Sequence, residues 1–265
     1  MSAATTRLGR AALAVGLAAC GGESPPAEDA ARSDDTAAPA AAADSAAPTY
    51  VAIEVVAGGT VRGTVRYQGV VLQGRTVTVT EDTATCGATR LVQPVLVGPQ
   101  GGLADAVVSL VDISQGAAPV PASPPTLDQR GCGFTPHVLM TPIGGTVRVL
   151  NSDPLTHNVH TAAFDNRSVN RTQPTGMAVI ELSFDAPEIV KVKCDLHPWM
   201  SAWIVVTAHP YHAVTDRAGA FVLSDVPPGS YTMEVWHETL GTRSQTVTVL
   251  AGETADITID LTEGG

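Results

Sequence analysis

The segment EIVKVKCDLHPWMSAWIVV, residues 188–206, alternates apolar and charged side chains and then breaks at a proline. In an extended chain, Val190 and Val192 fall on the same face as Cys194, and the two intervening lysines fall on the other face. The thiol of Cys194 is therefore predicted to point inward at the end of a strand, just before a loop.

His197 and Met200 follow on that loop, and SAWIVV resumes a strand after it. A strand–loop–strand hairpin of this kind delivers one thiolate, one imidazole and one thioether from a single short loop. One remote imidazole would complete a four-ligand metal site.

The rest of the chain after residue 50 also indicates an all-β fold. Val and Thr recur in short alternating runs, for example at 59–69, 75–82 and 103–113, and the 25 Gly and 19 Pro punctuate them. Long runs of helix-forming residues are missing. A chain of 265 residues, 44% of them hydrophobic, is long enough for two β domains, or one large one, with real cores.

The N-terminus has the features of an export signal. Arg7 and Arg10 precede the short apolar run AALAVGLAA, and small residues lead to Cys20. The stretch LAAC resembles the lipobox of bacterial lipoproteins, which implies lipidation of Cys20 after removal of residues 1–19. The alternative is an ordinary secretory signal with an incidental cysteine. Either way the protein is expected to leave the cytoplasm, and the apolar run is too short to span a bilayer.

Residues 21–50 contain mostly Ala, Pro, Asp, Glu and Ser, which cannot bury enough apolar surface to offset chain entropy. A disordered tether is therefore expected over residues 20–58. The formal charge of the chain is −11, which argues against nucleic acid and anionic lipid as partners and favours a cationic or neutral protein.

The cysteine count assigns a separate task to Cys194. Setting Cys20 aside leaves three cysteines, and an odd number outside the cytoplasm leaves one thiol free. Cys86 and Cys132 both lie in glycine-containing, turn-like stretches without neighbouring metal ligands, so we expect them to form a disulfide. Cys194 is then the thiol kept for chemistry.

The remote imidazole is expected from HNVH, residues 157–160. Residues three apart in an extended chain face opposite sides, so His157 and His160 cannot both reach one ion easily. One is the ligand and the other lies at the surface, and the pattern alone does not decide which.

The run GGTVRVLNSDPLTHNVH, followed by VKCDLHPWMSAWIVV, resembles the copper site of the cupredoxins, with the amicyanin-like members closest. The resemblance covers roughly residues 130–207 and implies a Greek-key β-sandwich. It also implies one type 1 copper ion with four ligands: His157, Cys194, His197 and Met200.

Three further residue roles follow from this resemblance. The side chain of Asn158 is expected to tie the two ligand loops together. The ring edge of His197 is expected at the surface, as the exit for electrons. Trp199 is expected near that edge, as a docking or a packing ring, with packing favoured.

The predicted ligand set suits copper better than its rivals. Two imidazoles, a thiolate and a weak axial thioether serve an ion that cycles between Cu(I) and Cu(II). A thioether is a poor zinc ligand, and a two-copper centre would need a second Cys in the loop. For the remaining histidines we expect solvated or hydrogen-bonded roles: His137, His160, His209, His212 and His237.

The stretch AVTDRAGAFVLSDVPPGSYTMEVWHE, residues 213–238, resembles the carboxypeptidase regulatory-like, transthyretin-type β-sandwich, a non-catalytic accessory module. We expect a copper domain with an N-terminal β extension at 59–207 and this smaller β domain at 208–265. GTVRGTVRYQGV, from residue 59, also looks like the first strand of such a module, so the two segments could instead pair across the copper domain.

These features together predict an all-β, lipid-anchored, extracytoplasmic copper protein that shuttles single electrons and is not an enzyme. Its partner would be a redox protein with a basic docking surface. Two alternatives stay open: a copper carrier or sensor, and a binding or adhesion module with a vestigial site.

Overall fold

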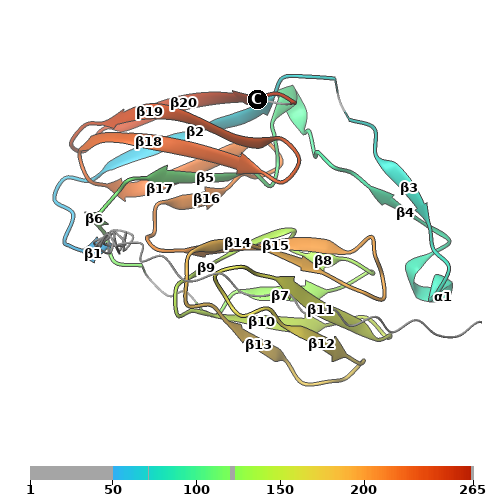
Figure 1. Cartoon of the computed structure of the whole chain (residues 1–265). Helices are drawn as coiled ribbons and strands as arrows, with labels where there is room; N and C mark the ends of the chain where they lie inside the picture. Colours follow the sequence, from blue (N-terminus) through green and yellow to red (C-terminus); the bar gives the residue numbers. More distant parts are fainter. Residues whose placement is uncertain (1–49, 71, 120–122, 264–265) are drawn as a thin grey trace, which may run out of the picture. The chain divides into compact units, whose positions relative to one another are not determined.

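The computed structural model describes residues 50–70, 72–119 and 123–263, which belong to one compact unit, residues 46–265. In these ranges strands carry nearly all the regular structure. The helical pieces are one turn of α-helix, α1 (Thr83–Cys86), and a 3-10 turn at Pro99–Gly101. The all-β prediction is confirmed (Figure 1).

The middle of the chain forms a sandwich of two sheets. The four-stranded sheet has the order β13-β10-β7-β8, and the five-stranded sheet has the order β12-β11-β14-β15-β9. The strands are β7 (Thr126–Gln129), β8 (Phe134–Thr135), β9 (Val138–Pro142), β10 (Thr146–Asn151), β11 (His157–Ala162), β12 (Asn170–Gln173), β13 (Ile180–Ser183), β14 (Glu188–Lys193) and β15 (Ser201–Thr207). The chain crosses repeatedly between the sheets, as in Greek-key sandwiches.

Both sheets of this sandwich contribute to one hydrophobic core. Val147 and Val149 of β10 belong to the same buried cluster as Val190 and Val192 of β14. In β14 these two valines are buried, while Lys191 and Lys193 are exposed, so the alternation predicted from the sequence is confirmed. The inward face of β14 therefore leads directly to Cys194, which is buried.

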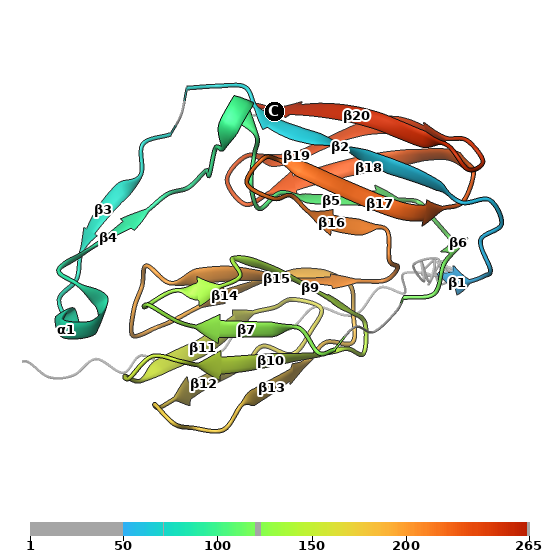
Figure 2. The ribbon, with the colours of Figure 1, turned by 180° about the vertical axis from the view of Figure 1, so that it is seen from behind.

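A second sandwich combines strands from both ends of the described chain. One sheet has the order β16-β5-β18-β19 and the other the order β17-β2-β20 (Figure 2). The strands are β2 (Gly59–Tyr67), β5 (Val107–Val111), β16 (His212–Val214), β17 (Ala220–Val226), β18 (Gly229–His237), β19 (Gly241–Val249) and β20 (Thr254–Leu261). Their buried side chains form one core cluster, for example Val65, Val108, Met233 and Ile259.

This pairing corrects the expected grouping of residues 59–207 as one copper domain with an N-terminal extension. β2 pairs in parallel with β20 and antiparallel with β17, and β5 pairs with β16 and β18. Their inward side chains complete the core of the C-terminal strands. The alternative expectation, that the early and late segments pair across the copper domain, matches the observed sheets.

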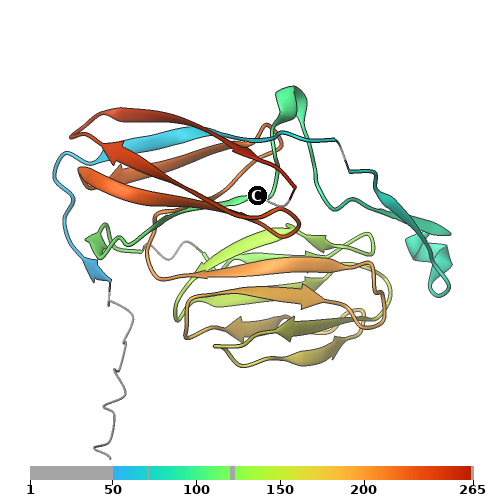
Figure 3. The same cartoon turned by 45° about the horizontal axis from the view of Figure 1, so that its top comes forward.

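A small hairpin lies between β2 and β5 in the sequence. It comprises residues 75–92 and is called the cap below. It consists of β3 (Arg75–Thr78), α1 and β4 (Thr89–Val92), with β3 and β4 paired antiparallel (Figure 3). The predicted disulfide between Cys86 at the end of α1 and Cys132 is present.

The end of the expected tether is more ordered than its composition indicated. β1 (Val51–Ala52) pairs in parallel with β6 (Gln115–Gly116), and the hydroxyl of Tyr50 donates to the Ala117 carbonyl at 2.7 Å. Tyr50 also packs against the core of the second sandwich, which offsets the entropy of ordering this stretch. The expected signal peptide, Cys20 and the tether up to residue 49 lie outside the described residues. Within the described ranges, no helix combines the length and apolar character needed to cross a membrane.

Candidate metal centre

The loop between β14 and β15 brings Cys194, His197 and Met200 into one buried turn. The Met200 backbone N–H donates to the His197 carbonyl at 2.9 Å, and the Cys194 N–H donates to the Met200 carbonyl at 3.3 Å. All three side chains are buried, and those of Cys194 and Met200 belong to the core of the first sandwich. The predicted hairpin is therefore present, with its chemically active side chains inward.

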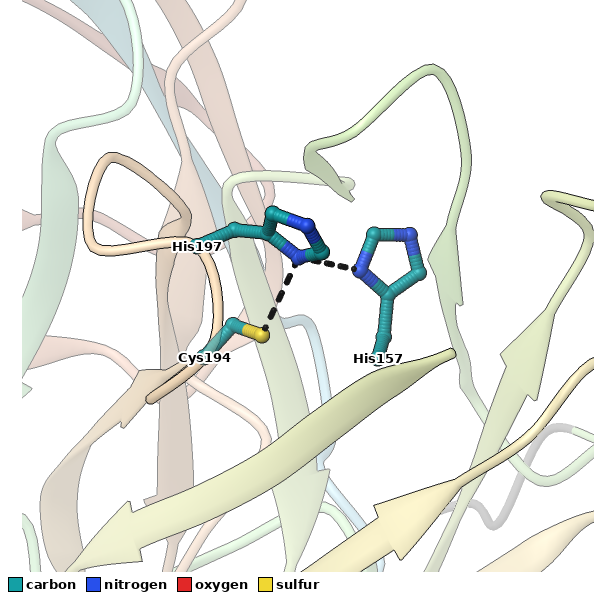
Figure 4. Close-up of side chains that lie close together, drawn as sticks. All are labelled: His157, Cys194 and His197. Carbon is teal, nitrogen blue, oxygen red and sulfur yellow. Dashed lines mark hydrogen bonds between the residues drawn. The ribbon is translucent and has the colours of Figure 1, made fainter. Parts of the chain in front are cut away.

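His157, the first residue of β11, faces this loop from a neighbouring strand. Its Nδ1 atom lies 3.0 Å from Nδ1 of His197, and that same His197 nitrogen lies 3.6 Å from Sγ of Cys194 (Figure 4). The three donor atoms lie within 4.8 Å of one another. The structure thus brings together three of the four predicted ligands around one point, and the fourth, Met200, is buried in the same loop.

β11 also separates the two histidines of HNVH, as the alternation requires. His157 is buried, whereas His160 lies on the outer side, where its Nδ1 is 2.8 Å from Oδ2 of Asp195. Of this pair, His157 is the one that faces Cys194 and His197. The ligand choice implied by the cupredoxin resemblance agrees with this geometry.

Each of the two facing imidazoles has a carboxylate at its far nitrogen. Nε2 of His157 lies 2.9 Å from Oδ2 of Asp153, and Nε2 of His197 lies 3.0 Å from Oδ2 of Asp82. A carboxylate in this position fixes the tautomer and orientation of a metal-binding histidine. Sequence reasoning missed both residues. The Asp-x-x-x-His spacing could have suggested Asp153, but no local signal leads to Asp82.

Burial and hydrogen bonding set the charge states near His157. Burial alone raises the pKa of Asp153, but hydrogen bonds from the Cys132 N–H, His157 and the Gly131 N–H outweigh it and hold that pKa below its usual value. For His157, burial, helped by the neighbouring His197, lowers the pKa below its usual value despite Asp153. A neutral imidazole is the form that binds a metal ion.

The expectation that the ring edge of His197 lies at the surface is wrong. The residue is only 1% exposed, because the cap covers its Nε2 side and Asp82 hydrogen-bonds to it. The resemblance to the cupredoxins extended only over residues 130–207 and could not include a segment contributed by residues 75–92.

Asn158 and Trp199 both connect parts of the site. Oδ1 of Asn158 accepts the Asp195 N–H at 2.8 Å, so this side chain joins β11 to the residue after Cys194. The expected tie between the ligand loops is therefore present. The Trp199 indole N–H donates to the Cys132 carbonyl at 3.0 Å, and its ring packs against the cluster that contains the disulfide. This arrangement agrees with the favoured packing role, and docking stays a prediction.

Among the described cysteines, Cys194 is the free one. A second group of possible metal ligands, Cys132, Asp153 and His157, also lies close together. Because Sγ of Cys132 is bonded to Cys86, it is not available to an ion. Of these two groups, the set of His157, Cys194 and His197 is thus the one whose donor atoms are all available to a metal ion.

The other histidines have structural surroundings. His137 hydrogen-bonds to Glu238, and the rings of His209 and His212 stack with centroids 4.4 Å apart. Burial lowers the pKa of His209 to about 4, and burial together with His209 lowers that of His212 to about 3. His209 and His237 accept local backbone N–H groups, whereas both ring nitrogens of His212 are buried without a hydrogen-bond partner in the described structure. His212 therefore departs from the expected solvated or hydrogen-bonded role.

The donor atoms are suited to a copper ion. Metal–nitrogen and metal–sulfur bonds in protein sites are about 2.0 and about 2.3 Å long, so separations of 3.0 and 3.6 Å allow the ligand atoms to share one ion. Two imidazoles and a cysteine sulfur, with a nearby methionine, form the donor set of blue-copper sites. His157, Cys194, His197 and Met200 therefore fit the ion that the resemblance implies.

Comparison with protein families gives one match. Residues 197–262 match the carboxypeptidase regulatory-like domain. This segment begins in the ligand loop, includes β15 and runs through the C-terminal strands into the residue after β20. No curated protein matches the chain.

Several solved structures resemble part of the chain. A copper-containing nitrite reductase from Thermus scotoductus SA-01 is 24% identical over 35% of this chain, with a TM-score of 0.31, and the match spans only 24% of that enzyme. A purple cupredoxin from Nitrosopumilus maritimus is 22% identical over 31% of this chain and 99% of its own, with a TM-score of 0.28. An oxidised proline-to-glycine mutant of amicyanin is 22% identical over 35% of this chain and 90% of its own, with a TM-score of 0.30.

Proposed function

We propose that the chain is a type 1 copper protein that carries single electrons between extracytoplasmic partners. The observation that carries this proposal is the convergence of three buried donor atoms: Nδ1 of His197 and Sγ of Cys194 from one turn, and Nδ1 of His157 from the neighbouring strand β11. Met200, buried in the same loop as Cys194 and His197, would be the fourth ligand.

Copper held by these residues would supply a one-electron couple between Cu(II) and Cu(I). The surrounding residues would orient the ligands and keep water away from the ion. Asp153 and Asp82 hold the two imidazoles in place, Asn158 fixes the start of the ligand loop, and the burial of the donor atoms excludes water. A site whose ligands are held in one geometry needs little rearrangement when the charge of the ion changes.

This function includes a proposed location and partner. The LAAC stretch supports lipidation of Cys20 and anchoring to a bacterial membrane, and the Cys86–Cys132 disulfide is typical of an oxidising compartment. The formal charge of −11 supports a redox protein with a basic docking surface as partner, with association slowed by added salt. In this proposal the chain carries electrons between other proteins and is not itself an enzyme.

The experiment that tests this function measures metal content and redox behaviour in the full-length protein. We expect one copper per chain, retained in the presence of equimolar zinc, and reversible one-electron reduction. Met200→Leu should still bind copper but raise the reduction potential, since it removes the weak thioether ligand that tunes this potential.

Other outcomes would favour the two alternatives. Copper that is bound but transferred rapidly to a competing chelator without redox cycling would indicate a carrier or sensor. Protein that takes up no copper at all would indicate a binding module with a vestigial site.

A further inference from the structure

The cap covers the side of His197 that faces away from the other ligands. Nδ1 of this ring points to His157 and Cys194, while Nε2 is 3.0 Å from Oδ2 of Asp82. Asp82 lies 115 residues earlier in the chain, and its side chain is 46% exposed. A carboxylate at the surface of the cap thus reaches inward to a buried ligand.

Several contacts fasten the cap to the loop that contains Cys132. Besides the disulfide, Nη2 of Arg90 donates to the Gly131 carbonyl at 2.7 Å. Val79 of the cap is buried in one cluster with the two disulfide cysteines. Asp82 is therefore held at its position by the anchored hairpin around it.

The same loop also holds the carboxylate behind the other imidazole. The Cys132 N–H donates to Oδ2 of Asp153 at 2.8 Å, and this oxygen lies 2.9 Å from Nε2 of His157. The disulfide consequently joins the two segments that support His157 and His197 from behind. Figure 4 shows the two rings facing each other across the site.

We propose that Asp82 is a positioning residue of the metal centre, and that the Cys86–Cys132 disulfide keeps it against His197. The inference rests on the copper site proposed above. It assigns to the cap a role in the chemistry of the site.

Asp82 would act on the metal centre in two ways. A hydrogen bond from Nε2–H to Asp82 leaves Nδ1 of His197 free to bind the ion and fixes the orientation of the ring. In addition, a negative charge close to copper stabilises Cu(II) more than Cu(I), and so lowers the reduction potential. Different substitutions of Asp82 can separate its effect on the orientation of the His197 ring from the effect of its charge.

The backbone of Asp82 suggests these substitutions. Its φ is 53°, in the left-handed region, which Asn tolerates and Gly adopts freely. Asp82→Asn keeps a hydrogen-bond acceptor but removes the charge, and Asp82→Gly removes the whole side chain without backbone strain. Glu81→Gln, at the exposed neighbouring position, is the matched control because it removes the same charge.

The first experiment measures the reduction potential, and the rate of Cu(I) transfer to bathocuproine disulfonate, in copper-loaded full-length protein. Asp82→Asn should weaken Cu(II) binding relative to Cu(I) about tenfold, which raises the potential by about 59 mV for one electron. Asp82→Gly should also speed copper transfer about 10- to 100-fold. Glu81→Gln should change neither quantity. Equal shifts in the Asp82 and Glu81 variants would overturn the proposal.

The second experiment tests the role of the disulfide. The double variant Cys86→Ser/Cys132→Ser should release copper at least as fast as Asp82→Gly, because the Cys132 loop also holds Asp153, and adding Asp82→Gly to it should bring little further change. Additive effects would mean that the disulfide does not act through Asp82. If the wild-type protein takes up no copper, the proposed function fails. If it takes up copper and the Asp82 variants behave like Glu81→Gln, only this inference fails.

Discussion

Sγ of Cys194 lies 3.6 Å from Nδ1 of His197, three residues later in the same loop. Both residues lie in the loop that follows β14, so this contact is formed within one short segment of the chain. The second imidazole, His157, comes from another strand, so the complete donor set depends on the sandwich being folded.

The first prediction separates the two histidines of HNVH. His157→Ala should abolish the charge-transfer colour of the Cu(II) protein, because it removes an inward ligand. His160→Ala is the matched control, since this residue lies on the outer side of β11 beside Asp195. Absorption spectra of the two Cu(II)-loaded variants show which histidine is the ligand. A colourless His160→Ala variant and a coloured His157→Ala variant would mean that His160 is the ligand.

The second prediction concerns the stability provided by the disulfide. Closing a loop between residues 46 positions apart stabilises a fold by about 4 kcal/mol in the chain-entropy model. Denaturant unfolding of the Cys86→Ser/Cys132→Ser variant should show a loss of this order. Peptide mapping of unreduced wild-type protein should recover the pair linked and Cys194 unpaired. Recovery of Cys86 and Cys132 as free thiols would contradict the structure.

The third prediction is a pH dependence of stability arising from the His137–Glu238 ion pair. Burial lowers the pKa of His137, but the hydrogen bond and charge of Glu238 outweigh it, so the pKa is raised above 6.5. Burial raises the pKa of Glu238, but His137 and Trp203 outweigh it, so the pKa is held below 4.5.

The sign of each shift gives the pH window. The contribution of His137 to the free energy of unfolding is complete below about pH 6.5 and is lost as the pH rises through its folded pKa. The contribution of Glu238 is complete above about pH 4.5 and is lost as the pH falls through its folded pKa. Glu238→Gln should therefore destabilise the fold most between these values, by about 1 kcal/mol. Glu181→Gln, on the exposed side of β13, is the control. An equal loss at pH 5.5 and pH 9 would rule out the ion pair as the cause.

Local patterns were sufficient to predict the all-β class, strand β14 and the ligand loop after it. The alternation in β14 placed Cys194 inward, and the same rule separated His157 from His160, because strand geometry fixes which side chains share a face. The choice of His157 still required the cupredoxin resemblance.

Long-range relationships could not be predicted in the same way. Pairs such as Arg62–Asp256, which join β2 to β20, are separated by 194 residues, and only sheet formation brings them together. Asp82 likewise has no local pattern that connects it to His197. Its place depends on the cap being held by the disulfide, which is why the covering of the His197 ring was not foreseen.

The most direct test of the copper site is the visible absorption spectrum of the full-length protein titrated with Cu(II). A thiolate sulfur bound to Cu(II) should give an intense charge-transfer band that saturates at one copper per chain and disappears on reduction. Cys194→Ser should lose this band while its far-UV circular dichroism stays that of the folded wild-type protein. A wild-type protein without the band, or a Cys194→Ser variant that keeps it, would contradict the assignment of Cys194 as the thiolate ligand.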